Sequence, residues 1–320
     1  MINYITDGFY PLTAFAGILF AFFATCLFTA KLQKFLPKDM GREFAHDGSL
    51  SAGKPRGAGI IFILVFTAAA LLFCELNVEI VIYLALVVVE MLTGYLDDAS
   101  DKPWGEYKKG ILDLIVAVIV AVTFIHFHTT TVELAILGIT FSIPPVVFGI
   151  LTVILVWVSI NVTNCSDGVD GLSGTLTIVT LVTIYVIDSI KGVGGSTPFL
   201  ILLFVVCLLG YLWYNATPSK LLMGDAGSRA MGVFIAIVVL QTESPFLYLL
   251  AAAVLIVDGG LGLVKVFLMR FLKIRILQHT RTPLHDHVRK VLGWSNTQTV
   301  FRFVIIQIVI SIATIYLLLI

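Results

Sequence analysis

Charged residues are scarce in this sequence. Asp, Glu, Lys and Arg make up 12% of its 320 residues, whereas hydrophobic residues make up 59% and the mean hydropathy is +1.03. Soluble domains carry about 25% charged residues, so this scarcity excludes an ordinary soluble protein. Cysteine is also rare: four residues lie scattered through mostly apolar segments, without a CxxC motif or the spacing of a zinc site. We therefore expect inert buried thiols.

Long apolar runs take the place of the missing charge. A bilayer span needs roughly 20 apolar residues, and about ten segments qualify. These segments are 10–30, 57–74, 78–96, 111–127, 145–163, 172–190, 197–213, 229–241, 246–269 and 301–320. Little chain remains for a soluble domain. The sequence predicts an all-α polytopic integral membrane protein with about ten transmembrane helices, forming a single domain over residues 1–320.

Basic residues are almost absent from every second gap between these segments. Of the 20 Lys and Arg residues, only Lys191 falls in an even-numbered gap. Because basic residues mark cytoplasmic loops, the odd-numbered gaps are predicted to be cytoplasmic and both termini to lie outside. The acidic residues close to the ends of the apolar segments lie in or beside the same gaps. We therefore expect the long cytoplasmic loops to form the active site.

Carboxylates at the ends of apolar helices are informative, since charge near a bilayer is costly and marks function by default. In GYLDDASDK, residues 94–102, Asp97 and Asp98 stand side by side and resemble the DDxxD pattern that binds diphosphate through magnesium. Mg²⁺ prefers oxygen ligands and usually keeps several waters. A solvated turn is the alternative for this pair, and Asp101 is expected to be a plain loop residue.

A second motif, NVTNCSDGVDGLSG at residues 161–174, places Asn164, Asp167 and Asp170 three residues apart. If the segment begins a helix, all three lie on one face within two turns. The gap holds no Lys or Arg, so these carboxylates lack a local counter-ion. A helix N-cap with a packing face is the alternative. It explains one Asp but not two with an Asn, and we favour a functional site.

A third motif, LLMGDAGSRAMG at residues 221–232, sets Asp225 between glycines, with Ser228 three residues later. The MGDAGS backbone is suited to an anion-binding helix start, and an Asp N-cap is the alternative. In the last cytoplasmic gap, KVFLMRFLKIRIL predicts an interfacial helix. His285 and His287 follow as candidates for binding a diphosphate or a metal.

Two carboxylates lie deeper in the apolar segments. Asp258 and Glu90 are candidate functional residues, because burying a charge at that depth is costly and is seldom found without a function. The alternative for Asp258 is a pair with a basic residue near a helix end. Glu90 has no assigned role.

The motifs together resemble the polyprenyl-phosphate N-acetylhexosamine-1-phosphate transferase superfamily, and within it the phospho-N-acetylmuramoyl-pentapeptide transferase family. The matching pieces are LDD at 96–98, NCSDGVDGLSG at 164–174, YNATPSKLLMGDAGS at 214–228 and PLHDH at 283–287. Their order and the ten-span layout match along nearly the whole chain. The NxxDGxDGL and MGDxGS pair is specific for the superfamily, while PLHxH favours the muramoyl branch.

The resemblance implies transfer of phospho-MurNAc-pentapeptide from its UDP donor to undecaprenyl phosphate, with Mg²⁺ as cofactor and UMP and lipid I as products. By motif, Asp225 corresponds to the magnesium ligand. Asp97, with Asp98 beside it, corresponds to the residue that activates or positions the lipid phosphate. His285 corresponds to a histidine on the diphosphate side. The expected substrate-binding residues are Asn164, Asp167, Asn215, Gly224, Ser228, Lys109 and His287, and Asp170 joins the catalytic face. We expect Lys108, Lys109, Lys220 and Arg229 to supply charge for the phosphates.

The chain departs from the family pattern in several places. GKPRGAG at residues 53–59 stands where the family usually has GTPTMGG, which adds Lys54 and Arg56. Asp101 stands where a Lys is usual. Asp286 interrupts the family's run of three histidines. Asp258 resembles a feature of the GlcNAc-transferring branch of the superfamily. These departures bear on the sugar contacts more than on the reaction class.

Other functions stay open at this stage. One alternative is transfer of phospho-GlcNAc from UDP-GlcNAc to the same lipid. An intramembrane prenyltransferase fits poorly, because the second acidic cluster is not of its DxxxD type. A cation-coupled transporter would hold its carboxylates near the midplane. The expected setting is the bacterial plasma (inner) membrane, with the site facing the cytoplasm. The expected partners are the bilayer and the two substrates, with a homodimer possible and no nucleic acid.

Overall fold

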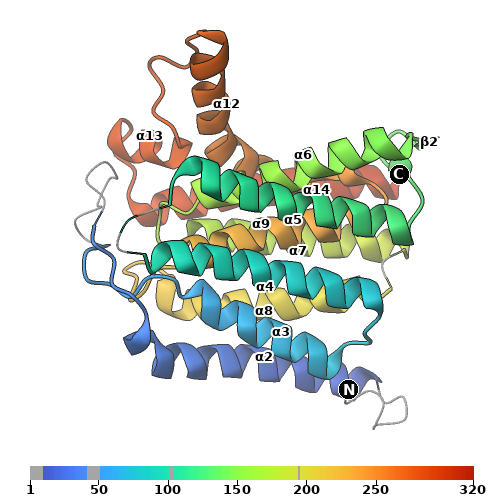
Figure 1. Cartoon of the computed structure of the whole chain (residues 1–320), viewed down its shortest axis with the longest axis horizontal. Helices are drawn as coiled ribbons and strands as arrows, with labels where there is room; N and C mark the ends of the chain where they lie inside the picture. Colours follow the sequence, from blue (N-terminus) through green and yellow to red (C-terminus); the bar gives the residue numbers. More distant parts are fainter. Residues whose placement is uncertain (1–9, 42–50, 101, 103, 194) are drawn as a thin grey trace.

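The structure, a computed structural model, describes residues 10–41, 51–100, 102, 104–193 and 195–320. Within these ranges eight helices are long and apolar enough to cross a membrane. They are α2 (Tyr10–Leu32, continued by η1, Gln33–Phe35), α4 (Val78–Asp98), α5 (Glu106–Phe127), α6 (Pro145–Cys165), α7 (Leu172–Lys191), α8 (Thr197–Asn215), α9 (Gly224–Gln241) and α14 (Asn296–Leu319). They lie roughly side by side along one direction (Figure 1).

Two further apolar segments complete the bundle. The helix α3 (Gly59–Phe73) is apolar but shorter. The segment from Pro245 to Leu272 passes the same test as a ninth span, but it is bent by 72°. It comprises η3 (Pro245–Leu247), α10 (Tyr248–Ala251), α11 (Ala253–Leu255), η4 (Ile256–Gly260), α12 (Leu261–Phe267) and η5 (Leu268–Leu272). The described residues therefore form a polytopic helical protein. The number of ten transmembrane helices and the side of the membrane on which each terminus lies stay predictions.

Smaller elements lie at the two ends of the bundle. A two-stranded antiparallel hairpin, β1 (Thr131–Leu134) with β2 (Ile139–Ser142), joins α5 to α6 and is the one exception to the helical prediction in the described chain. At the opposite end of the bundle, α12 projects away from the other helices and α13 (Leu284–Lys290) lies beside it (Figure 1). The projecting segment, α12 with η5, exposes Phe267, Phe271 and Arg270, and its place at a lipid interface stays a prediction.

The helix α9 runs through the middle of the bundle, and every residue from Gly224 to Leu240 is buried. Small residues near its start let the neighbouring helices approach its backbone closely. A Cβ atom on Gly59 would lie 2.0 Å from the backbone N of Gly227, and one on Gly94 would lie 2.4 Å from the carbonyl carbon of Asp225. These approaches bring the starts of α3 and α9 and the LDD end of α4 together.

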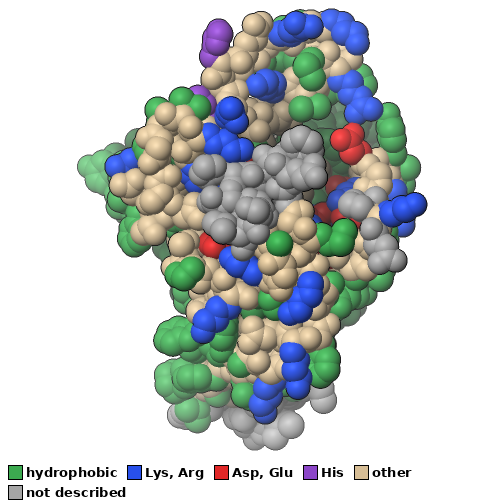
Figure 2. All heavy atoms as spheres, turned by 90° about the vertical axis from the view of Figure 1, so that its left-hand side faces the viewer, with side chains coloured by type: hydrophobic (Ala, Val, Ile, Leu, Met, Phe, Trp, Pro, Cys, Tyr) green, Lys and Arg blue, Asp and Glu red, His purple; other side chains and the backbone are tan. Residues whose placement is uncertain are grey.

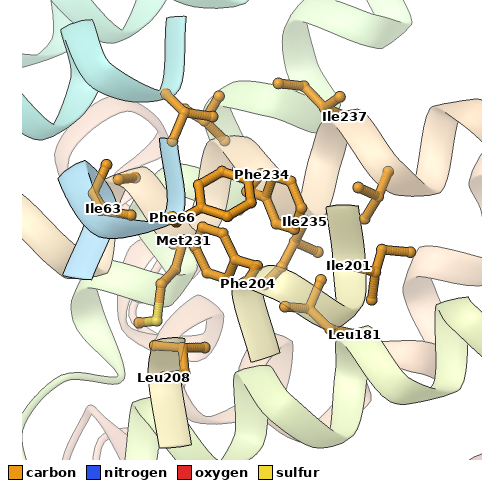
Figure 3. Packing of buried hydrophobic residues seen from close by; sticks show 14 of the residues in the cluster. Ile63, Phe66, Leu181, Ile201, Phe204, Leu208, Met231, Phe234, Ile235 and Ile237 are labelled. Atoms are coloured by element: carbon orange, nitrogen blue, oxygen red, sulfur yellow. The ribbon is translucent and has the colours of Figure 1, made fainter. Parts of the chain in front are cut away.

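Farther along α9, aromatic packing fills the core. The rings of Phe204 and Phe234 stack with their centroids 4.2 Å apart, and Phe66 meets Phe204 edge-on at 4.8 Å (Figure 3). Both arrangements are favoured by the ring quadrupole. The three side chains come from α8, α9 and α3, so they fix α9 laterally in the bundle.

One turn below the start of α9, a buried ionic cluster ties three helices together. Arg229 of α9 donates from Nε to Glu90 of α4 at 2.8 Å and from Nη2 to Asp113 of α5. Asn161 of α6 donates to the other oxygen of Asp113 at 3.2 Å. The side chains of Glu90, Asp113 and Arg229 are at most 3% exposed. Glu90, unassigned from the sequence, is therefore a member of this cluster.

We predict that Gly59→Ala destabilises the protein by about 1–3 kcal/mol, because the new methyl group meets the backbone of α9 and the helices must separate. The matched control is Gly110→Ala in α5, where a Cβ atom meets nothing within 4 Å. Unfolding in detergent, followed by heat or denaturant, measures both. Equal stability of the two variants would contradict the close crossing of α3 and α9.

We also predict that Arg229→Met destabilises the protein by about 3–5 kcal/mol, since it leaves Glu90 and Asp113 buried without their counter-ion. The triple variant Glu90→Gln, Asp113→Asn, Arg229→Met is expected to recover much of that loss. Arg270→Met, which removes an exposed pair with Glu106, is the control and should cost less than about 1 kcal/mol. A stable single Arg229 variant would show that the cluster is not charged as described.

Candidate active site

The predicted site residues gather at the end of the bundle that carries α13. Figure 2 looks onto this end: acidic side chains lie inside a hollow, and Lys and Arg side chains surround it. Ion pairs at this end join the end of α4, the starts of α5 and α9, the turn between α6 and α7, and the loop at residues 51–58.

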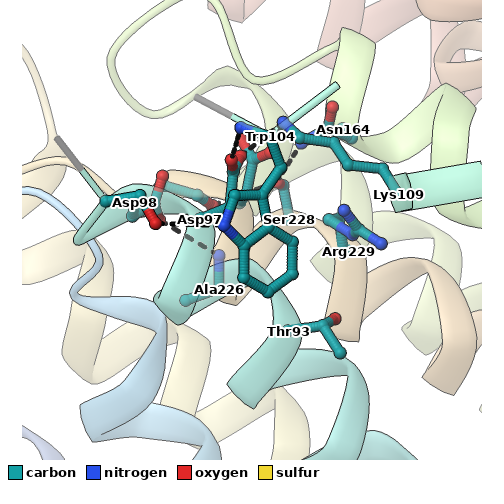
Figure 4. A network of polar contacts seen from close by, with 12 residues as sticks. Thr93, Asp97, Asp98, Trp104, Lys109, Asn164, Ala226, Ser228 and Arg229 are labelled. Carbon is teal, nitrogen blue, oxygen red and sulfur yellow. Dashed lines mark hydrogen bonds and ion pairs between the residues drawn. The ribbon is translucent and has the colours of Figure 1, made fainter. Parts of the chain in front are cut away.

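Lys109 joins the first two carboxylates of the site (Figure 4). Its ammonium group contacts Oδ2 of Asp97 and lies 3.0 Å from Oδ2 of Asp225. The backbone N–H of Trp104 donates to Oδ1 of Asp97 at 2.6 Å. Asp97 and Asp225 are the last-turn and first-turn residues of α4 and α9. One cation thus holds two carboxylates that would otherwise repel each other.

Asp98 points to the other side of the helix end. Its side chain is 0% exposed, it accepts the backbone N–H of Ala226 at 3.3 Å, and it lies 2.9 Å from Nη2 of Arg56. A Cβ atom on Gly224 would lie 2.1 Å from Oδ2 of Asp98, so only glycine fits there. The start of α9 therefore donates to a side chain of the chain itself, and its use in binding a substrate anion stays a prediction.

We name Asp97, Asp98 and Asp225, with Lys109 and Arg56, the carboxylate cluster. Asp225 is not a helix N-cap, because that position belongs to Met223 and shows no side-chain cap bond. Nη2 of Arg56 lies 3.7 Å from Oδ1 of Asp225. Burial opposes the charge on Arg56, yet the nearby carboxylates outweigh it and raise the pKa of Arg56 above its ordinary value.

The helix-start interpretation of NVTNCSDGVDGLSG is wrong. The helix α6 ends at Cys165, and α7 begins only at Leu172 after Gly171, whose φ of +82° favours glycine. Asn164 therefore lies in the last turn of α6, whereas Asp167 and Asp170 lie in the turn between the helices. The spacing of three residues does not place them on one helical face.

The three polar residues of this motif have separate partners. Asn164 donates to the hydroxyl of Ser228 at 2.9 Å, and Asp167 accepts the hydroxyl of Ser173 at 2.7 Å. Asp170 accepts the backbone N–H of Ser219 at 3.1 Å and lies 3.9 Å from Nζ of Lys54. The counter-ion that the gap itself lacks thus comes from the loop at residues 51–58.

Asn215 lies beneath this turn and braces it. Its Oδ1 accepts the backbone N–H of Gly171 at 2.8 Å, and its Nδ2 donates to the carbonyl of Leu221 at 2.9 Å. Both ends of the amide therefore bind backbone groups of the chain. The structure gives this predicted nucleotide-site residue a role in holding the 166–171 turn beside the segment that precedes α9.

His285, at the start of α13, is held by the deep carboxylate Asp258. Asp258 accepts the backbone N–H of His285 at 2.7 Å, and its Oδ2 lies 2.9 Å from Nδ1 of the ring. A Cβ atom on Gly168 would lie 2.2 Å from Nε2 of the same ring. Asp258 thus pairs with a histidine at a helix start, and Nε2 of His285 faces the 166–171 turn.

The other predicted residues are more peripheral. Nδ1 of His287 lies 3.3 Å from the backbone N of Arg281, and Asp286 forms ion pairs with Arg289 and Lys290. Of the cations expected to meet phosphates, Lys109 lies in the cluster and Lys220 is exposed, but Lys108 stacks on Trp104. Arg229 was wrongly placed in that set, because it is committed to Glu90 and Asp113. Asp101 lies outside the described residues.

Metal-binding capacity is limited in the described part of the chain, where no three His, Cys, Asp or Glu side chains are arranged to hold a metal ion. Two carboxylate oxygens, from Asp97 and Asp225, converge on the ammonium group of Lys109. That number suits Mg²⁺, which commonly takes one or two carboxylates and completes its shell with waters and substrate phosphates.

Two residues of the site, Arg56 and Lys54, were not among the predicted ones. Both belong to GKPRGAG, where the departure from the family pattern was a visible signal. Their partners lie far away in the sequence, at Asp98, Asp225 and Asp170. Local spacing therefore gave no indication that this loop closes the site.

Known proteins resemble this chain over most of its length. The model of glycosyl transferase family 4 matches residues 80–243. The phospho-N-acetylmuramoyl-pentapeptide-transferase of Treponema pallidum (strain Nichols) is 41% identical over 310 residues, which cover 91% of this chain and 85% of that protein. The protein of the same name from Borreliella burgdorferi (strain ZS7) is 28% identical over 98% of this chain and 95% of its own length. The chain therefore belongs to glycosyl transferase family 4, among the phospho-N-acetylmuramoyl-pentapeptide-transferases.

Proposed function

We propose that this protein transfers phospho-MurNAc-pentapeptide from UDP-MurNAc-pentapeptide to undecaprenyl phosphate, giving lipid I and UMP. The named relatives support the substrates. The observation that carries the chemistry is the carboxylate cluster, in which three aspartates from two apolar helices meet Lys109 and Arg56 at one end of the bundle. Such a place serves both a donor from the cytosol and an acceptor from the bilayer.

The reaction is a displacement at phosphorus. An oxygen of the lipid phosphate forms a bond to the sugar-linked phosphorus of the donor, and the bond from that phosphorus to the bridging oxygen breaks. UMP leaves with the electron pair of that bond. The lipid phosphate is already ionised, so the site has to position two anionic groups and screen their repulsion. Lys109 and Arg56 are the side chains placed to do so.

The structure favours direct attack over an aspartyl-phosphate intermediate. Asp98 is 0% exposed and is bound by Arg56 and the start of α9, and Asp97 is 4% exposed and is bound by Lys109 and Trp104. A nucleophilic carboxylate would have to leave these partners. We propose instead that Asp97 positions Lys109 near the lipid phosphate, with Asp98 holding Arg56 beside it.

Mg²⁺ is proposed as the cofactor, held by Asp225 with Asp97. When bound, it would neutralise charge on the phosphates as a Lewis acid. The oxygens of these two residues that now face Lys109 are the ones suited to it. Lys109, which contacts both carboxylates, would supply positive charge for the substrate phosphates beside the metal. Asn164 and Ser228, linked across the cluster, and His285, directed by Asp258, are proposed to bind the donor.

The setting follows from the same family assignment. We propose ten spans in the bacterial plasma membrane, both termini outside, one domain over residues 1–320 and a site that faces the cytoplasm. The ends of α4 and α9 that carry the cluster border the basic loops, which supports this orientation. No nucleic acid is expected, and a homodimer is a further prediction.

The function is tested by UMP release from purified protein in detergent with undecaprenyl phosphate and Mg²⁺. We expect release with UDP-MurNAc-pentapeptide and not with UDP-GlcNAc. Release with UDP-GlcNAc alone would keep the displacement chemistry and assign the sister activity. No release with either donor, from protein shown to be folded, would contradict the proposal.

Within the cluster we expect Asp225→Asn to lower turnover at least about 100-fold, because it removes a charge that holds the metal. Asp97→Asn should lower turnover by a similar factor while UMP binding changes less than about threefold, because Asp97 serves the acceptor. Glu133→Gln, in the hairpin at the opposite end and paired with Lys191, is the control. Full activity of folded Asp225→Asn would make that residue structural.

A further inference from the structure

The loop that departs from the family pattern places a cation inside the carboxylate cluster. We propose that Arg56 is a resident cation of the active site, a positioning residue that opposes divalent-metal binding and attracts the phosphates of the nucleotide donor. The inference rests on the proposed function for the identity of the donor. Its geometry rests on contacts of residues 51–59 with α4, with α9 and with neighbouring segments of the chain.

The guanidinium group of Arg56 lies among several carboxylates. Its Nη2 is 2.9 Å from Oδ1 of Asp98 and 3.7 Å from Oδ1 of Asp225, and its Nη1 is 3.4 Å from Oδ1 of Asp39. Asp167 also acts on it electrostatically. Asp225, the residue proposed to hold Mg²⁺, is thus flanked by two cations, with Lys109 at one oxygen and Arg56 at the other.

Backbone hydrogen bonds fix the position of this loop. Arg56 donates its N–H to the carbonyl of Pro37 at 2.8 Å, and Leu222 donates to the carbonyl of Pro55 at 2.8 Å. Ala58 donates to the carbonyl of Leu222 at 3.1 Å. Gly57, with a φ of +81°, then turns the chain into α3. Arg56 is therefore held directly beside the segment that leads into Asp225.

Arg56 differs from a purely structural arginine in its accessibility. Its side chain is 22% exposed, whereas that of Arg229, which serves the buried ionic cluster, is 3% exposed. A guanidinium has five N–H donors in a fixed plane and binds phosphate oxygens well. Arg56 can hold Asp98 and still offer donors to a phosphate that enters the hollow.

Two opposite effects follow from this charge. A fixed cation 3.7 Å from Asp225 disfavours a divalent cation at the same carboxylate. The same charge favours the anionic donor. Removal of Arg56 should therefore strengthen metal binding and weaken nucleotide binding, whereas simple damage to the loop would weaken both.

The test measures Mn²⁺ binding by electron paramagnetic resonance and UMP binding by calorimetry, on the full chain in detergent. For Arg56→Gln we expect Mn²⁺ to bind at least about threefold more tightly and UMP about tenfold more weakly. Arg56→Lys keeps the charge and should shift Mn²⁺ affinity less than about twofold. Lys38→Gln removes an exposed cation from the segment that pairs with the loop at Pro55. It is the control and should change neither.

Parallel weakening of both ligands by Arg56→Gln, or no change in either, would overturn the inference. If that variant fails to fold because Asp98 is left unpaired, Arg56→Gln with Asp98→Asn removes both buried charges. The double variant should still bind UMP about tenfold more weakly, and UMP binding equal to the parent would overturn the inference. Neither measurement involves sugar transfer, so a failure of the proposed donor specificity would be seen separately in the UMP-release assay.

Discussion

Repulsion between carboxylates held close together in an apolar bundle is the constraint on which this site depends. Asp97 and Asp225 share the ammonium group of Lys109, and Asp98 shares the guanidinium of Arg56 with Asp225. Without these cations one or more of the acids would have to be protonated. The same solution recurs below the site, where Arg229 compensates Glu90 and Asp113. In both clusters, buried acidic side chains share a cation.

The close approach of helix backbones makes the arrangement possible. Gly59, Gly94 and Gly227 bring α3, α4 and α9 nearly into backbone contact, and Gly224 leaves room for the carboxylate of Asp98. The start of α9 can then bind Asp98 through the backbone N–H of Ala226. The buried aromatic rings farther along α9 hold the helix in place, so the position of Asp225 is set by packing as much as by charge.

The apolar segments and the LDD and MGDAGS motifs could be predicted from the sequence, because span length and local pattern determine them. The course of NCSDGVDG could not: a period of three residues suits a helix, yet the chain turns at Gly171 with a positive φ. The contacts of Arg56, Lys54 and Asp258 were also missed, since their partners lie far away along the chain. Tertiary packing, and not the local sequence, determines which residues these side chains contact.

The most direct test of this account is a crystal structure with Mn²⁺ and UMP, in which anomalous scattering locates the metal. The account predicts one Mn²⁺ within coordination distance of Asp225, with the ammonium group of Lys109 displaced toward the nucleotide phosphate and Arg56 still on Asp98. A metal bound elsewhere, with Lys109 still joining Asp97 to Asp225, would contradict it.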